Sequence, residues 1–204
     1  MKEILPGIHH WTAFHEGIRM EVSSYHLADD PVTVLDPMVP EEGIDWFREQ
    51  GPPGQILLTN RHHYRHSDDF QERYGCPVFC NREGLHEFEN GPPVEGFSIG
   101  VEVAPAIVTR EVGAICPDDT ALHVTVGDGV LAFGDGLIRS GDGSLGFVSD
   151  FLLGDDPEAV RHGLTDALRN LLELDFDTLL FAHGEPLAGG GKTALRRFLE
   201  LIPV

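Results

Sequence analysis

Alternating apolar and polar residues along the first third of the chain predict β-strands. The alternation covers the stretches IHHWTAF, IRMEVSSYHL and TVLD, and a nearly all-apolar run, QILLT, follows further on. An uninterrupted apolar run is typical of a strand that is covered on both faces. Strands are therefore expected at 8–14, 18–27, 33–36, 55–59 and 77–80.

Two short helices are expected between these strands. Residues 41–50 follow a proline, carry apolar residues at helical spacing and end at a Gly-Pro-Pro-Gly run. Residues 67–74 begin with Ser67 as the predicted N-cap and have acidic residues in the first turn, where the helix dipole favours them. A histidine-rich segment lies between the predicted strand 55–59 and this second helix.

The second half of the chain mixes strands with longer helices. Asp156 and Pro157 mark the start of the clearest helix, which has apolar residues at helical spacing. Strands are expected at 106–112, 121–135 (with a hairpin turn at 127–129) and 177–186, helices at 155–174 and 193–202, and loops at 81–105 and 137–151. The order predicts a single domain, 1–204, with a mixed α/β fold of two sheets and outer helices.

The amino-acid composition limits the classes of binding partner and the cellular compartment that we expect for this protein. The 14 basic and 34 acidic side chains give a formal net charge of −20, which argues against nucleic acid or an anionic membrane surface as a partner. No apolar stretch is long enough to span a bilayer, and the N-terminus lacks the apolar run of a signal peptide, so a cytoplasmic location is expected. The three cysteines, Cys76, Cys80 and Cys116, are expected to be buried thiols in a reducing compartment.

The stretch LLTNRHHYRHSDDF, residues 57–70, carries the chemistry that stands out in the sequence. It holds His62, His63 and His66 within five positions, and clustered imidazoles suggest a metal site. Arg61 and Arg65 in the same stretch argue the opposite, because a fixed cation repels a metal ion.

Several anchors in a fixed order resemble the metallo-β-lactamase superfamily. VTVLDP ends a predicted strand with Asp36, and the histidine stretch stands where that family carries T-H-x-H-x-D-H before a helix. AFGDGL places Asp135 where the family has its metal-bridging aspartate, and LLFAHGEP places His183 where it has its last histidine. The resemblance covers nearly the whole chain. It implies a four-layer αββα sandwich with the active site along one edge of two facing sheets.

The metal-binding motif of that family is incomplete in this chain. With Thr59 aligned, His62 matches the second histidine, and the other ligand positions hold Asn60, Tyr64 and Arg65. With one residue inserted, His63 and His66 match the second and third histidines, and arginines occupy the remaining positions. The further histidine expected before strand 121–135 is absent: the stretch REVGAICPDDT offers Ala114, Ile115 or Cys116.

Two functions stay open from these residues. In the first, which we favour, the two-metal centre is lost, no cofactor is bound, and Arg65 or Arg61 pairs with Asp135, so the protein is a non-catalytic or ligand-binding relative. In the second, His66 (or His62), Asp135 and His183 bind one zinc, iron or manganese ion and hydrolyse a small ester, thioester or lactone. These residues and His63 are the metal candidates.

The remaining expectations are less specific. Asn60, Arg61, Tyr64, Arg65 and Asp36 are expected to line the pocket, with Asp36 in a turn or hydrogen-bonded to a ligand rather than bound to metal. No residue is assigned as catalytic. The small-molecule ligand is not identified by the sequence, because specificity in this fold comes from loops. A structural role, as a homodimer, is a third hypothesis.

Overall fold

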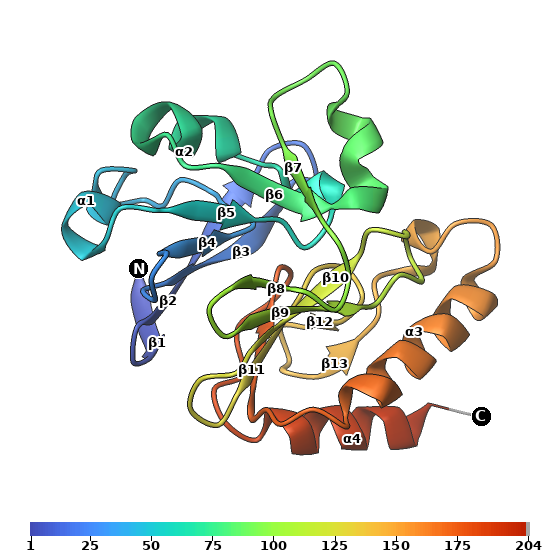
Figure 1. Cartoon of the computed structure of the whole chain (residues 1–204). Coiled ribbons are helices and arrows are strands. Elements are labelled where there is room, and N and C mark those ends of the chain that lie inside the picture. The colour runs from blue at the N-terminus through green and yellow to red at the C-terminus, as the bar shows by residue number, and fades with distance from the viewer. Residues whose placement is uncertain (203–204) are drawn as a thin grey trace. The chain divides into compact units, whose positions relative to one another are not determined.

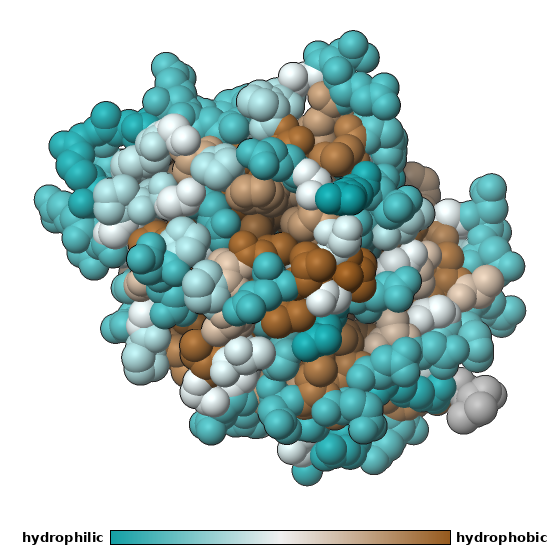
Figure 2. Space-filling view, viewed as in Figure 1, coloured by the Kyte–Doolittle hydropathy of each residue, from teal (hydrophilic) through white to brown (hydrophobic). Residues whose placement is uncertain are grey.

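The computed structural model describes residues 1–202 (Figure 1). The described residues fall into two compact units, 1–98 and 99–202. Each unit has its own main sheet and its own helices. Hydrophilic residues cover much of the surface visible in Figure 2. Over residues 1–202, no helix is both long and apolar enough to span a membrane.

The sheet of the first unit has seven strands in sequence order. Its first four strands pair antiparallel, and its last four pair parallel. The carboxyl ends of the parallel strands therefore open at one edge of the sheet, where side chains from successive loops can meet. The strands are β1 (Lys2–Leu5), β2 (Ile8–His15), β3 (Met20–Leu27), β4 (Thr33–Leu35), β5 (Gln55–Leu57), β6 (Val78–Asn81) and β7 (Glu95–Phe97).

Two α-helices, α1 (Trp46–Gln50) and α2 (Ser67–Tyr74), pack on this sheet. Phe47 of α1 and Phe70 of α2 are fully buried in one apolar cluster with Val34, Ile56 and Val78 of the strands. Two 3-10 helices, η1 (Arg61–His63) and η2 (Arg82–Phe88), follow β5 and β6.

Two details of these helices differ from the prediction. The first helix starts at Trp46 rather than at residue 41, because residues 41–45 form turns in which Gly43 adopts a positive φ. The predicted N-cap at Ser67 is wrong: His66 holds that position, and the Ser67 hydroxyl donates to the carbonyl of Tyr64 at 2.5 Å.

The main sheet of the second unit has five strands in the order β14-β11-β10-β9-β8. β11 and β14 pair parallel, and the other neighbours pair antiparallel. A small hairpin of β12 (Ile138–Arg139) and β13 (Leu145–Gly146) lies apart from it in the sequence-predicted loop. The main strands are β8 (Glu102–Ala104), β9 (Ile107–Glu111), β10 (Thr120–Val124), β11 (Val130–Phe133) and β14 (Thr178–Phe181).

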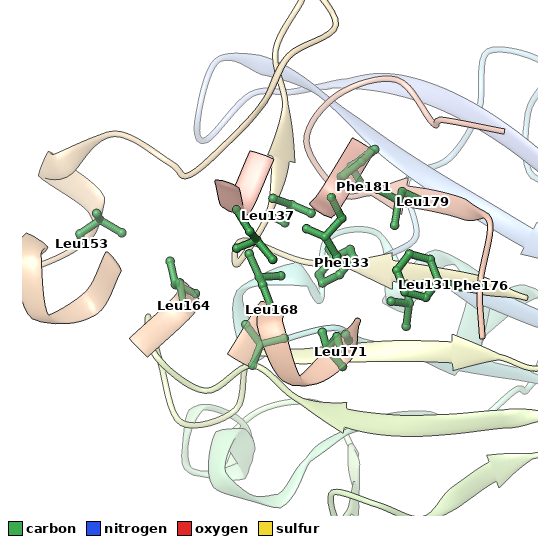
Figure 3. Close-up of a cluster of buried hydrophobic side chains, with 14 residues drawn as sticks. Leu131, Phe133, Leu137, Leu153, Leu164, Leu168, Leu171, Phe176, Leu179 and Phe181 are labelled. Carbon is green, nitrogen blue, oxygen red and sulfur yellow. The ribbon is translucent and has the colours of Figure 1, made fainter. Parts of the chain in front are cut away.

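Helices α3 (Pro157–Leu171) and α4 (Gly191–Leu201) form the core of this unit with the sheet. Figure 3 shows Leu164 and Leu168 of α3 in one cluster with Phe133 and Phe181 of the strands. A 3-10 turn, η3 (Asp150–Leu152), precedes α3, whose N-cap is Asp156 as predicted.

Several short strands were not predicted, because their residues show no alternation of apolar and polar side chains. β1 precedes the first predicted strand, and the expected loop 81–105 contains η2, β7 and β8. Cys76, Cys80 and Cys116 are free and buried. Whether the chain acts as a single domain stays a prediction.

Candidate functional site

Asp36 is the centre of a buried hydrogen-bond cluster in the first unit. It directly follows β4, and Thr59 and His63 follow β5, which is the parallel neighbour of β4. Thr59 donates its backbone N–H to Asp36 Oδ1 at 2.8 Å and its hydroxyl to Oδ2 at 2.6 Å. The Nδ1 atom of His63 lies 3.0 Å from Oδ2. Adjacent parallel strands thus bring together residues that are 23 and 27 positions apart.

The carboxylate of Asp36 is ionised despite its burial. Burial alone would raise its pKa, but the nearby imidazole of His63, the guanidinium of Arg65 and the hydroxyl of Thr59 lower the pKa below its ordinary value. The backbone of Asp36 has a φ of 45°, a left-handed conformation that is uncommon outside glycine. Such conformations persist where the surrounding contacts hold them, and they concentrate at functional sites.

The hydrogen bond to Asp36 selects the tautomer of His63. An ionised carboxylate can only accept, so Nδ1 of His63 donates and the lone pair of a neutral ring is at Nε2. Histidines that bind metals in proteins usually donate their other ring N–H to a carboxylate or carbonyl, which fixes the ring and raises its basicity. His63, which is buried, has this arrangement.

Arg65 belongs to the same cluster and makes two hydrogen bonds to backbone. Its Nη1 atom donates to the carbonyls of Ser23 and Asp36, each at 2.8 Å. The hydroxyl of Ser24 donates to the same Asp36 carbonyl at 2.6 Å. Arg65 also has a positive φ, 48°. The guanidinium therefore ties β3 to the end of β4, and its predicted pairing with Asp135 stays a prediction.

The other side chains of the histidine stretch have separate roles in the first unit. The side chain of Asn60 accepts the backbone N–H of His62 and caps η1, while His62 itself is exposed. The hydroxyl of Tyr64 donates to Asp68 and Gln71 of α2, at 2.5 and 2.9 Å. Burial and the neighbouring Asp68 raise the pKa of Tyr64, so the phenol stays protonated.

His66 and His15 complete the description of this region. Nδ1 of His66 accepts the backbone N–H of Val39 at 3.0 Å, so the ring holds the loop after β4 against α2. Burial and then the charge of Arg65 lower the pKa of His15, at the end of β2, and His66 and His63 act in the same direction. No pattern in the sequence pointed to His15, because its strand shows only ordinary alternation.

The second unit contains one histidine–aspartate pair at the predicted positions. β11 and β14 are parallel with Phe133 opposite Phe181, and Asp135 and His183 each lie two residues beyond that pair. The same register carries both side chains to the carboxyl edge of the sheet. Nε2 of His183 lies 3.0 Å from Oδ1 of Asp135, and both side chains are partly exposed.

Gly184 fixes the turn that follows His183. Its φ is 111°, and a Cβ atom there would lie 2.0 Å from the carbonyl oxygen of Arg139. The backbone N–H of Arg139 donates to the carbonyl of His183 at 3.0 Å, and its guanidinium donates to the carbonyl of Pro186 at 2.8 Å. Close packing against the β12 strand thus requires a glycine directly after His183.

Solved structures similar to this chain share one fold. TTHA1623 in a di-iron-bound form has a TM-score of 0.68 and 22% identity, over 90% of this chain and 96% of that one. The DIM-1 metallo-β-lactamase has a TM-score of 0.74 and 13% identity, over 98% and 94%. FIM-1 from Pseudomonas aeruginosa, a metallo-β-lactamase in its mono-zinc form, has a TM-score of 0.71 and 13% identity, over 97% and 93%. No protein-family model and no curated protein matches the chain.

Proposed function

The chain has the metallo-β-lactamase fold that its sequence predicts, and from this premise we propose that it is a hydrolase-like protein with one metal centre in place of two. The proposed activity is hydrolysis of a small ester, thioester or lactone. The proposed ligands are His63, Asp135 and His183. The observation that carries the proposal is the hydrogen bond between Asp36 and His63, which places the ring proton on Nδ1 and the lone pair of a neutral, buried imidazole on Nε2.

The chemistry of these donors fits a divalent metal. Two imidazoles and one carboxylate form a set that suits zinc, and also iron or manganese, and three protein ligands leave a position for water. Each part of the set is held rigidly within its own unit. Thr59 and Asp36 orient His63, and the Gly184 turn and the Asp135 contact orient His183.

A second metal would lack ligands. Of the positions that supply ligands in the family motif, Asn60 caps η1, Tyr64 bonds to α2 and Arg65 binds two backbone carbonyls. An amide, a protonated phenol and a guanidinium are all poor ligands for a divalent ion. The fixed positive charge of Arg65 also opposes a cation beside it.

The residues of the chain have distinct parts in the proposed reaction. A bound ion would supply a water of lowered pKa as the nucleophile. Asp36 keeps the proton of His63 on Nδ1, so that Nε2 can act as a ligand. Arg65, which cannot lose its proton at working pH, provides positive charge that could orient an anionic substrate but cannot act as a base.

Metal analysis tests the proposal. Protein purified without chelator is expected to hold about one zinc, iron or manganese ion per chain. His63→Gln and Asp135→Ala should both lose the ion and lose turnover of a panel of aryl esters, thioesters and lactones. His162→Gln, which changes an exposed histidine on α3, serves as the matched control and should retain both.

Two further variants separate His63 from its neighbours. His62→Gln and His66→Gln should keep the ion if His63 is the ligand, whereas loss of the ion in either variant assigns the ligand to that residue instead. About two ions per chain would contradict the single centre. No metal and no turnover in the wild type would favour the second candidate, a non-catalytic ligand-binding relative, which the position of Arg65 beside Asp36 supports.

A further inference from the structure

A groove within the second unit has binding chemistry that the proposed metal centre does not use. It lies between α3 and β9 and has a volume of about 510 Å³. Ligand sites in proteins commonly fall between about 300 and 1,000 Å³, and they combine an apolar lining with a few polar groups. This groove has both components, contributed by residues 99–114 on one side and 163–174 on the other.

Small residues on both walls create the space. Gly163 and Ala167 lie one turn apart on the same face of α3. A Cβ atom on Gly163 would lie 3.0 Å from Cβ of Ala114, so the helix and the segment after β9 come close at that point. On the sheet, Arg110 of β9 pairs in register with Ala121 of β10, another small residue. Arg110 therefore lines the groove beside small residues of the neighbouring strand and of the helix.

Arg110 has a buried donor without an acceptor. Its Nε atom is shielded from solvent and makes no hydrogen bond within residues 1–202. No ion pair in that part of the chain neutralises its charge either. The charge of the guanidinium, without a partner among the described residues, favours an anionic group in the groove. The amide of Asn170 on the facing helix lines the same groove and adds hydrogen-bonding capacity.

The other residues that line the groove determine which kind of ligand it favours. Leu171 and Leu174 line the groove from the helical side, and Ile99, a partly exposed apolar residue, lines it from the other. Glu111 also lines it, and its negative charge opposes an anionic ligand, more strongly one with two charges than one with a single charge. A singly charged head with an aliphatic body therefore matches Arg110, Asn170 and the apolar residues with the least repulsion from Glu111.

We propose that this groove is a binding site for a medium-chain carboxylate. The carboxylate accepts from the guanidinium of Arg110 and from the amide of Asn170, and the aliphatic chain covers Leu171, Leu174 and Ile99. The site is separate from the proposed function, because all of its residues belong to the second unit and none is a proposed metal ligand.

Titration of the whole protein with octanoate, followed by amide NMR shifts, tests the proposal. Octanoate should bind saturably and shift amides of residues 99–114 and 163–174. Arg110→Met should weaken binding by about tenfold or more, the loss expected for a charge-assisted hydrogen bond. Arg110→Lys should retain part of the affinity. Arg169→Met, an exposed arginine on α3 that contacts Asp166, is the matched control and should bind as the wild type does.

Two additional binding measurements test the groove and the charge preference separately. Ala167→Leu fills the groove from the opposite wall, and it should abolish binding while Arg110 remains in place, which covers the case in which Arg110→Met fails to fold. Octyltrimethylammonium, with the same chain and the opposite charge, should not bind. The proposal is overturned by absence of octanoate binding in the wild type, by shifts that map outside the groove, or by equal affinity for both probes.

Discussion

Replacing Asp36 by Asn removes one charge from the centre of the buried cluster with little change in shape. Asparagine tolerates a positive φ as well as aspartate does, so the backbone at 45° is not strained further. The new amide can still accept the backbone N–H of Thr59 on Oδ1. Its NH2 group, however, replaces Oδ2, which accepts from the Thr59 hydroxyl and from His63.

The magnitude follows from those two contacts. Each hydrogen bond to a charged group contributes about 1.5–3 kcal/mol, and the variant recovers part of this by rotating the hydroxyl and switching the imidazole tautomer. Asp36→Asn should therefore lower the free energy of unfolding by about 2–4 kcal/mol at pH 7. The tautomer switch places the proton of His63 on Nε2, and this should weaken metal affinity by about 10- to 100-fold.

Urea denaturation of chelator-treated protein over a range of pH measures the first effect. Because contacts in the fold lower the pKa of Asp36, its contribution is fully present above the unfolded pKa of about 3.9 and is lost as the pH falls through the lower, folded value. The difference between wild type and variant should shrink below about pH 4. Asp155→Asn, at an exposed position before α3, is the control. A difference under about 0.5 kcal/mol at pH 7, or one that does not change with pH, would refute the reasoning.

Leu168→Ala, in the core of the second unit, should lower the unfolding free energy by about 2–5 kcal/mol in urea denaturation. Asp156→Ala removes the N-cap of α3 and should cost about 1 kcal/mol in the same assay. Gly184→Ala places a Cβ against a backbone carbonyl at 2.0 Å, so it should reduce both stability and metal content, and retention of full metal content would contradict the role of that turn. Burial lowers the pKa of His26, so the wild type should lose stability as the pH falls below about 6.5; His26→Phe should flatten that dependence, whereas the exposed variant His162→Gln should not.

The sequence was sufficient to identify the candidate site residues that directly follow a strand. Asp36, Asp135 and His183 were identified because each follows a recognisable strand, and parallel pairing then brings strand ends to one edge. The pairing of Asp135 with His183 follows directly from the register of β11 and β14. Local pattern and topology are sufficient at such positions.

The sequence could not show which of the three clustered histidines points into the protein. They lie in and beside a 3-10 turn, where no hydrophobic period fixes which side chain points inward. The structure buries His63 and exposes His62, a difference set by the contacts of Thr59 and Asp36. The left-handed backbone conformation of Arg65 could not be predicted either, because arginine has no preference for a positive φ.

The local contacts that shape the two candidate clusters are each built within one unit of the chain. The hydrogen bonds that join Asp36, Thr59 and His63 lie within residues 1–98, whereas the turn behind His183 is built by Gly184, Arg139 and Pro186 of the second unit. Substitutions in the loop 60–65 leave the Gly184 turn and its hydrogen bonds with Arg139 in place, because that turn is packed by residues of its own unit. The backbone at position 183 is thus shaped locally, whatever residues the histidine stretch carries.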